Sequence, residues 1–249
     1  SSAASDVYKR QLGDKVNFVV PTGNFGNILA GYYAEQIGLP VNKLICASNN
    51  NNVLYDFLKT GVYDKNRDFL KTVSPSMDIL ISSNLERLLY YVSGCDNAYV
   101  ASLMKDLKET GRFEVTKEIL NRIQEKFQTG FADDLDTKQT IKKIYEKDSY
   151  LLDTHTAVAY KVLLDNLDKE HVNVVLSTAS PYKFTESVYT SLNEATNEDE
   201  FTLMNKLHEQ TKVAIPENLK DLDKKVIRHK DVINKNEMKK YILEKLGDL

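Results

Sequence analysis

The sequence of 249 residues has no tryptophan, only two cysteines and no long apolar run. Two cysteines are too few for a disulfide framework, and Cys46 lies in an apolar run, so we expect a buried thiol in a reducing compartment. No apolar run approaches the roughly 20 residues that a membrane-spanning helix needs. The formal net charge is only -3, which gives no electrostatic reason to expect nucleic acid or an anionic membrane as a partner. These absences predict a cytoplasmic globular protein.

The first eleven residues differ from the rest of the chain. Residues 1–11 have no sustained apolar periodicity and lack the apolar centre of a secretory signal. They look like a translated cloning adapter, so we treat them as a non-native leader and exclude them from fold prediction. The remainder, residues 12–249, begins just ahead of a buried strand, and we therefore expect the N-terminal part of the domain to be missing.

Residues 16–37 predict a strand, a tight turn and a helix in succession. The mostly apolar, valine-rich residues 16–20 are followed by Pro21, Gly23 and Gly26, and an apolar-periodic segment begins directly afterwards. Such a turn lets backbone N–H groups approach an anion. Tight helix–strand packing would explain the two glycines equally well. The third glycine of a dinucleotide fingerprint and the Gly-Lys-Ser/Thr of a Walker loop are both absent, which leaves a small phosphate as the candidate ligand.

Further strands at residues 43–47 and 172–176 alternate with helical segments, which predicts an α/β fold with a mainly parallel sheet and flanking helices. Residues 96–150 are rich in Lys and Glu and predict a helical excursion from this core. One of its helices should begin at Thr116 and carry Ile119, Ile123 and Phe127 on its apolar face.

Two helix starts carry polar residues of interest. Ser83 and Glu86 have the spacing of a capping box, and Arg87 points away from the apolar face behind it. Asp153 is a predicted N-cap, and His155 follows in the first turn, where the helix dipole favours a neutral imidazole. By themselves these residues fit a surface arginine and a structural histidine just as well. No Cys/His cluster has the spacing of a metal site.

Several landmarks in a fixed order are more specific than any one of them. They are residues 20–27 (VPTGNFGN), 38–40 (GLP), 49–52 (NNNN), 74–79 (SPSMDI), 82–88 (SSNLERL), 153–158 (DTHTAV) and 176–184 (LSTASPYKF). In this order they resemble the threonine synthase family, which consists of pyridoxal-phosphate enzymes of fold type II. The resemblance implies the large domain of that fold, in this chain its C-terminal portion only.

The resemblance also implies roles for individual residues. The cofactor phosphate would be held by Gly23, Asn24, Phe25, Gly26 and Asn27, and the ring nitrogen by Thr178. The substrate would be bound by Ser83, Asn84, Arg87 and Lys183, and His155 would donate to its phosphate or relay a proton. Many family members have a histidine where this chain has Ser180.

The implied reaction is that of a lyase in threonine biosynthesis, which converts O-phospho-L-homoserine and water to L-threonine and phosphate. In the family, the lysine that forms the Schiff base with pyridoxal phosphate lies well upstream of the phosphate loop, and no lysine of this sequence matches its motif. We therefore expect the chain as given to be inactive, and the intact enzyme to be a monomer or homodimer. The alternatives are another fold-type-II lyase, such as a threonine or serine dehydratase, and a non-catalytic phosphometabolite-binding protein.

Overall fold

The computed structural model of the chain describes residues 13–247. They divide into two units, one ending at Val213 and one beginning at Ala214. The leader predicted at residues 1–11 lies outside the described residues. Within residues 13–247, no helix combines the length and the apolar character needed to span a membrane.

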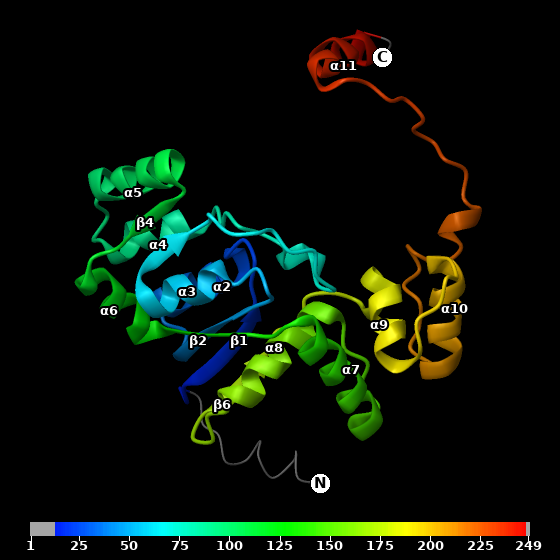
Figure 1. The fold of residues 1–249 in the computed structure, drawn as a ribbon, viewed down its shortest axis with the longest axis horizontal. Coiled ribbons are helices and arrows are strands. Elements are labelled where there is room, and N and C mark those ends of the chain that lie inside the picture. The colour runs from blue at the N-terminus through cyan, green and yellow to red at the C-terminus, as the bar shows by residue number, and fades with distance from the viewer. Residues whose placement is uncertain (1–12, 248–249) are drawn as a thin grey trace. The chain divides into compact units, whose positions relative to one another are not determined.

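Strands and helices alternate through most of the first unit (Figure 1). The strands are β1 (Val16–Pro21), β2 (Val41–Ser48), β3 (Val62–Asp64), β4 (Arg112–Glu114), β5 (Phe127–Phe131) and β6 (Val172–Val175). The α-helices are α2 (Gly26–Gln36), α3 (Val53–Thr60), α4 (Leu85–Val92), α5 (Asn97–Thr110), α6 (Lys117–Lys126), α7 (Asp134–Asp148), α8 (Thr154–Asp165), α9 (Thr185–Leu192) and α10 (Glu200–Thr211). Two short 3-10 helices, η1 (Pro75–Met77) and η2 (Pro181–Phe184), complete the unit.

A parallel sheet with the strand order β5-β2-β1-β6 forms the centre of this unit. The predicted β1-α2-β2 unit is present, because β1 and β2 pair in parallel through the intervening helix. The α/β fold class with a mainly parallel sheet is thus confirmed. All four strands point the same way, so the loops that follow them emerge at one edge of the sheet.

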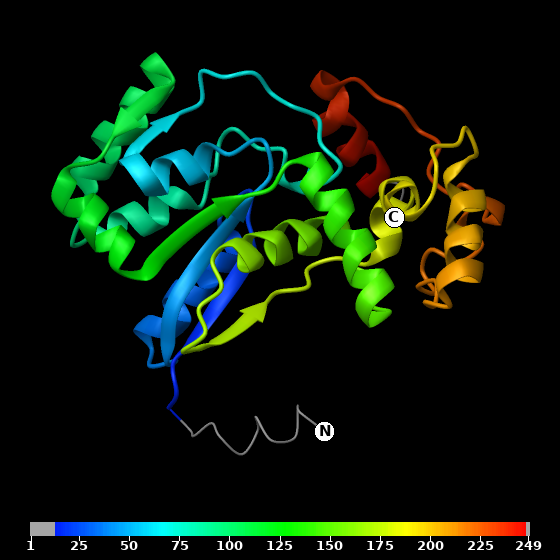
Figure 2. The same cartoon turned by 60° about the horizontal axis from the view of Figure 1, so that its bottom comes forward.

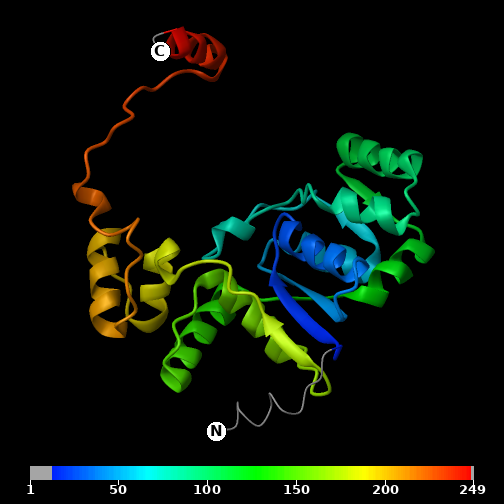
Figure 3. The ribbon, with the colours of Figure 1, turned by 180° about the vertical axis from the view of Figure 1, so that it is seen from behind.

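Both faces of the sheet are buried, as neighbouring residues of β1 show. Val20 packs with residues of α2, α3, α4 and α6 in one apolar cluster, whereas Val19 packs with α8 in another. Successive strand residues point to opposite faces, so a continuous apolar run is what a sheet covered on both sides requires. Figures 2 and 3 show α8 on one side of the strands and α2 on the other.

The helical excursion predicted at residues 96–150 needs a correction. Helix α6 begins after Thr116 as predicted, but it ends at Lys126, and Phe127 starts strand β5 at the edge of the central sheet. Phe127 continues the helical spacing of Ile119 and Ile123, which is why periodicity alone extends the helix. Tertiary contact decides otherwise, because the Phe127 ring packs 5.6 Å from that of Phe25. Strands β3 and β4 add a small antiparallel sheet.

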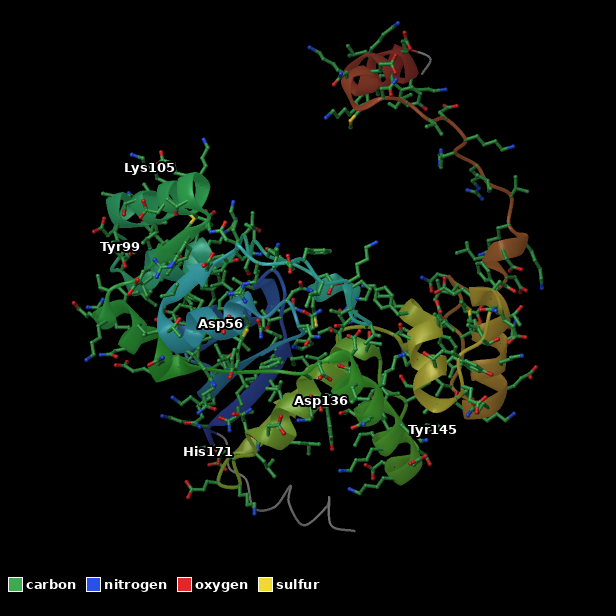
Figure 4. The ribbon with its side chains drawn as sticks, viewed as in Figure 1. Asp56, Tyr99, Lys105, Asp136, Tyr145 and His171 are labelled. Atoms are coloured by element: carbon green, nitrogen blue, oxygen red, sulfur yellow. The ribbon has the colours of Figure 1, made fainter. Side chains whose placement is uncertain are left out.

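A row of asparagines connects three strands at the opposite edge of the sheet. Asn17 of β1 donates to Asn173 Oδ1 of β6 at 3.0 Å and accepts from Asn42 Nδ2 of β2 at 2.9 Å. Asn17 also donates to Asp168, which lies 2.8 Å from His171 Nδ1 (Figure 4). These hydrogen bonds, with that from Asn17 first, lower the pKa of Asp168 to about 2. The row fixes the register of the strands whose other ends carry the candidate site.

The described part of the second unit, residues 214–247, contains two 3-10 helices and one α-helix. They are η3 (Leu222–Lys224), η4 (Lys235–Glu237) and α11 (Met238–Gly247). The apolar side chains Met238, Ile242 and Leu246 of α11 are exposed. Asn234 and Glu237 form a capping box at the start of η4.

The two cysteines differ in exposure, which gives a direct test of the packing. Cys46 is fully buried in β2, and burial raises the pKa of its thiol to about 12, while Cys95 is exposed. A thiol reacts as its thiolate. We therefore expect a disulfide reagent such as DTNB to titrate one thiol in the native protein at pH 8 and two in guanidinium chloride. The native reaction should disappear in Cys95→Ser and persist in Cys46→Ala; the reverse pattern would contradict the fold.

Candidate functional site

The loop between β1 and α2, called here the glycine loop (residues 22–27), presents a row of unpaired backbone donors. Thr22 N–H donates to the Ala47 carbonyl at 2.8 Å, which holds the loop against the end of β2. Within the described part of the chain, the N–H groups of Gly23, Asn24, Phe25, Gly26 and Asn27 donate to no protein acceptor. Consecutive free N–H groups at a helix N-terminus form a site for an anion.

Phe25, rather than a glycine, takes the left-handed conformation that forms the turn. Its φ is 63° and its ψ is 8°, and it stands as the N-cap of α2 without a side-chain cap. A non-glycine residue in this region costs about 1–3 kcal/mol. Its fully buried ring offsets that cost by packing in the core. The sequence suggests glycine for this task, so Phe25 is the part of the turn that was not predicted.

Residues 82–84 hold the glycine loop from outside by three side chains. Ser82 Oγ donates to the Gly23 carbonyl at 2.9 Å, and Asn84 Nδ2 donates to the Asn24 carbonyl at 2.8 Å. Asn24 Oδ1 accepts from both the N–H and the Oγ of Ser83, at 2.6 and 2.8 Å. The structure therefore brings together two groups of predicted site residues that lie about sixty positions apart in the sequence.

The capping box predicted at Ser83 and Glu86 is wrong. Helix α4 begins at Leu85 with Asn84 as N-cap and no side-chain cap. The Ser83 hydroxyl points to Asn24 and donates to its Oδ1, and it accepts from no backbone N–H of the helix.

Arg87 is exposed on the first turn of α4, and its Nη1 donates to Asn84 Oδ1 at 2.7 Å. It borders a surface groove of about 410 Å³, whose lining residues are Tyr33, Glu86, Arg87, Tyr90, Tyr91 and Val100. The placement agrees with the predicted orientation of Arg87 away from the apolar face; its substrate role stays a prediction.

Residues 74–79 pack directly against the glycine loop. A Cβ atom added to Gly23 would lie 3.0 Å from Met77 Cα and 3.3 Å from the Ser76 carbonyl oxygen. Only glycine permits so close an approach of two backbones. At Gly26 the nearest atom, Asn84 Nδ2, would be 3.6 Å away, an ordinary contact distance, so a methyl group fits at this position.

The asparagine-rich turn after β2 fixes this segment through a buried polar network. Asn49 Nδ2 donates to Asp78 Oδ1 at 2.8 Å and to Ser74 Oγ at 3.1 Å, and Asn51 Nδ2 donates to the same Asp78 oxygen at 2.9 Å. Upstream of the segment, Arg67 forms an ion pair of 2.8 Å with Asp56 of α3 (Figure 4). These contacts make the segment a fixed wall of the site.

Two predicted site residues, His155 and Lys183, meet at Ser76. Ser76 N–H donates to His155 Nε2 at 3.2 Å, and Lys183 Nζ donates to Ser76 Oγ at 3.1 Å. Because Nε2 accepts, the imidazole carries its proton on Nδ1, which lies 3.4 Å from Asp153. His155 is buried with 3% exposure, so both ring nitrogens face protein groups. Ser76 belongs to the landmark of residues 74–79, but the sequence predicts no role for this residue.

Asp153 is the buried N-cap of α8, as predicted. Its carboxylate accepts from the N–H groups of His155 and Thr156 and from the Thr156 hydroxyl. Burial raises the pKa of Asp153, but the contact with the His155 side chain and the hydrogen bonds from Thr156 outweigh it and hold the pKa below its usual range. A charged carboxylate thus orients the first turn that carries His155.

Thr178 lies beyond β6, at the same edge of the sheet as the glycine loop. Leu176 N–H donates to the Val19 carbonyl at 3.0 Å, so the segment leaves the sheet beside β1. Thr178 is exposed, and Ser180 caps η2 by accepting from Tyr182 N–H. Within residues 13–247, no cluster of His, Cys, Asp and Glu is arranged to hold a metal ion.

Comparison with known proteins identifies relatives of this chain. The model of the family "Threonine synthase, C-terminal" matches residues 156–242. Threonine synthase of Saccharomyces cerevisiae is 40% identical over 225 residues, which cover 84% of this chain and 42% of the yeast protein. Threonine synthase-like 1 of Homo sapiens is 40% identical over 183 residues, covering 73% of this chain and 24% of the human protein. The chain thus spans less than half the length of these relatives.

Solved structures share the fold over most of the chain. A crystal structure of threonine synthase from yeast superposes with a TM-score of 0.80 at 37% identity, covering 94% of this chain and 48% of that one. Threonine synthase from Brucella melitensis, solved with PLP bound, gives a TM-score of 0.72 at 39% identity, covering 81% of this chain and 44% of that one.

The two glycines of the loop should respond differently to a methyl group. Gly23→Ala places Cβ against the backbone of Met77, and we expect it to lower the free energy of unfolding by about 1–3 kcal/mol. Gly26→Ala, in the first turn of α2, is the matched control and should change it by less than about 1 kcal/mol. Urea unfolding measures both. Equal losses would show that the wall does not touch the loop at Gly23.

The buried cap of α8 gives a pH-dependent prediction. The folded-state pKa of Asp153 is below the unfolded value of about 3.9, so its stabilising contribution is present above that value and is lost as the pH falls through the folded pKa. We expect Asp153→Asn to destabilise the protein by about 1–3 kcal/mol at pH 7. The difference in the free energy of unfolding between wild type and Asp153→Asn should become smaller below about pH 4.

The exposed N-cap Asp199 of α10 provides the matched control for this measurement. Asp199→Asn should cost less stability than Asp153→Asn at pH 7, because the Asp199 carboxylate is accessible to water. A gap between wild type and Asp153→Asn that stayed constant from pH 7 to 3 would contradict the argument.

Proposed function

Because the chain is a homologue of the C-terminal part of threonine synthases, we propose that it carries the cofactor-phosphate site and part of the substrate site of such an enzyme. The proposed reaction converts O-phospho-L-homoserine and water to L-threonine and inorganic phosphate. The proposed cofactor is pyridoxal phosphate. None of the lysines of this sequence is proposed as the Schiff-base lysine, because none matches its motif in the family.

The observation that carries the proposal is the row of unpaired N–H groups in the glycine loop. The Gly23 and Asn24 carbonyls accept from Ser82 and Asn84, which holds the loop in place. The loop N–H groups precede the first intrahelical hydrogen bond of α2 and have no protein acceptor in residues 13–247. Five backbone donors and the positive end of the α2 dipole suit a phosphate group. The residues present therefore fit the phosphate of the proposed cofactor.

Pyridoxal phosphate, when bound, supplies an electron sink that makes protons on the substrate carbons removable. The Thr178 hydroxyl, beside the end of β1, is proposed to hydrogen-bond the ring nitrogen. A neutral hydroxyl leaves that nitrogen unprotonated more readily than a carboxylate would.

The substrate phosphate needs its own cation, and Arg87 is the proposed one. A guanidinium binds phosphate oxygens through two parallel N–H groups. Arg87 is exposed beside the glycine loop and forms no ion pair with any carboxylate in residues 13–247. Lys183 adds a second positive charge at Ser76.

His155 is proposed to act through Ser76. Its Nε2 accepts from the Ser76 backbone, and Ser76 lies against Gly23. The imidazole would then set the distance between residues 74–79 and the glycine loop, which explains a buried histidine in the site without direct contact to substrate.

The human relative named threonine synthase-like 1 supports a second candidate. A related lyase or phosphometabolite-binding protein could use the same glycine loop with a different substrate. A lyase whose substrate carries no phosphate would not need Arg87, whereas a phosphometabolite-binding protein would still hold a phosphate but lack the Schiff-base lysine.

Substitution of Arg87 in the full-length protein tests the proposal. We expect Arg87→Ala to raise the KM for O-phospho-L-homoserine about a hundredfold, because a charge-assisted bidentate contact is lost. Arg112→Ala is the control, since Arg112 is an exposed arginine on β4 that pairs with Glu114; its KM should stay unchanged. An unchanged KM in Arg87→Ala would remove Arg87 from the substrate site and favour the second candidate.

A further inference from the structure

We propose that Asn84 is a positioning residue that fixes the Arg87 guanidinium relative to the glycine loop. In this role it couples the substrate-phosphate site to the cofactor-phosphate site. The inference rests on the proposed function and replaces the predicted role of Asn84 as a direct phosphate donor.

Both ends of the Asn84 side chain are occupied by other groups of the site. Its Nδ2 donates to the Asn24 carbonyl at 2.8 Å, and its Oδ1 accepts from Arg87 Nη1 at 2.7 Å. A primary amide is planar and rigid, so a group bound at one end is held at a fixed distance from a group bound at the other. Asn84 thus connects the backbone of the glycine loop to the guanidinium of Arg87.

On the loop side, Asn84 acts together with its two neighbours. Ser82 donates to the Gly23 carbonyl and Ser83 donates to the Asn24 side-chain oxygen. Asn84 donates to the Asn24 carbonyl. Loss of the Asn84 contact would leave the Asn24 carbonyl without this side-chain donor and remove one of the hydrogen bonds that hold the loop. The loop would shift, and its donors would no longer be aligned for a phosphate.

On the arginine side, the contact limits a long and flexible side chain. Arg87 is exposed, and no carboxylate of the described residues neutralises or orients it. The Asn84 contact is the one hydrogen bond that the described residues give its guanidinium. Holding the guanidinium in place before substrate binds reduces the entropy lost on binding.

The two contacts of one amide therefore predict coupled binding. A phosphate on the glycine loop stabilises the loop position that Asn84 needs, and Asn84 in that position holds Arg87 ready for the second phosphate. By reciprocity, substrate should also strengthen cofactor binding.

A double-mutant cycle in the full-length protein tests this inference. We expect Asn84→Ala to raise the KM for O-phospho-L-homoserine about tenfold, as loss of a hydrogen bond to a charged group predicts. In the Arg87→Ala background the same change should raise KM by less than about twofold, because the group that Asn84 positions is already absent. Asn84→Ser, which removes the amide but keeps a good helix-start residue, should behave like Asn84→Ala.

Calorimetric titration with pyridoxal phosphate provides the second readout, independent of activity. The dissociation constant should rise severalfold in Asn84→Ala and stay unchanged in Arg87→Ala, since only Asn84 contacts the loop. Asn121 is an exposed asparagine of α6, and Asn121→Ala is the matched control. It should change neither the KM for substrate nor the dissociation constant for pyridoxal phosphate. A purely structural role for Asn84 would not make its effect on KM depend on Arg87.

Two results would overturn the inference, and they are distinguishable. Suppose that Arg87→Ala raises KM and that Asn84→Ala raises KM by the same factor with Arg87 present or absent. Asn84 then does not act through Arg87, and the proposed function stands. If Arg87→Ala leaves KM unchanged, the proposed substrate site fails and this inference fails with it. Unchanged cofactor affinity in Asn84→Ala would refute the connection to the loop.

Discussion

The hydrogen bonds that residues 82–84 donate to the glycine loop determine how the rest of the site is arranged. They hold the loop at the carbonyls of Gly23 and Asn24, while α2 begins only at Gly26, after the left-handed Phe25, so the N–H groups of residues 23–27 have no intrahelical partner. Unpaired backbone donors cost free energy when no water or ligand meets them. A phosphate offsets that cost, which is why the site favours an anion over a neutral ligand.

The fold holds this arrangement from both sides. The central sheet fixes the loop at the end of β1, with both faces buried and the asparagine row fixing the register at the far edge. Residues 65–84 have little regular structure, so their position depends on side-chain contacts to Asn49, Asn51 and His155. The site is therefore rigid where it contacts the loop and open where Arg87 reaches the surface groove.

Local signals in the sequence predict the strand–turn–helix of residues 16–37 and the Asp153 cap, because each depends on neighbours in the chain. Strand β5 was missed because Phe127 continues the spacing of a helix, and only its packing on Phe25 reveals the strand. The capping box at Ser83 failed for a similar reason, since the partner of Ser83 is Asn24, far away in sequence. The family resemblance names the site residues but does not tell which of them contact one another, and so the Ser76 contacts appear only in the structure.

The central claim is that the unpaired N–H groups of the glycine loop bind the cofactor phosphate. Its most direct test is to follow the backbone amide resonances of residues 23–27 by NMR while titrating the protein with pyridoxal phosphate, with pyridoxal as the unphosphorylated control. Amide protons of these residues should move downfield with pyridoxal phosphate and stay in place with pyridoxal, because only the phosphate accepts their hydrogen bonds. Equal shifts with both ligands, or none with either, would contradict the account.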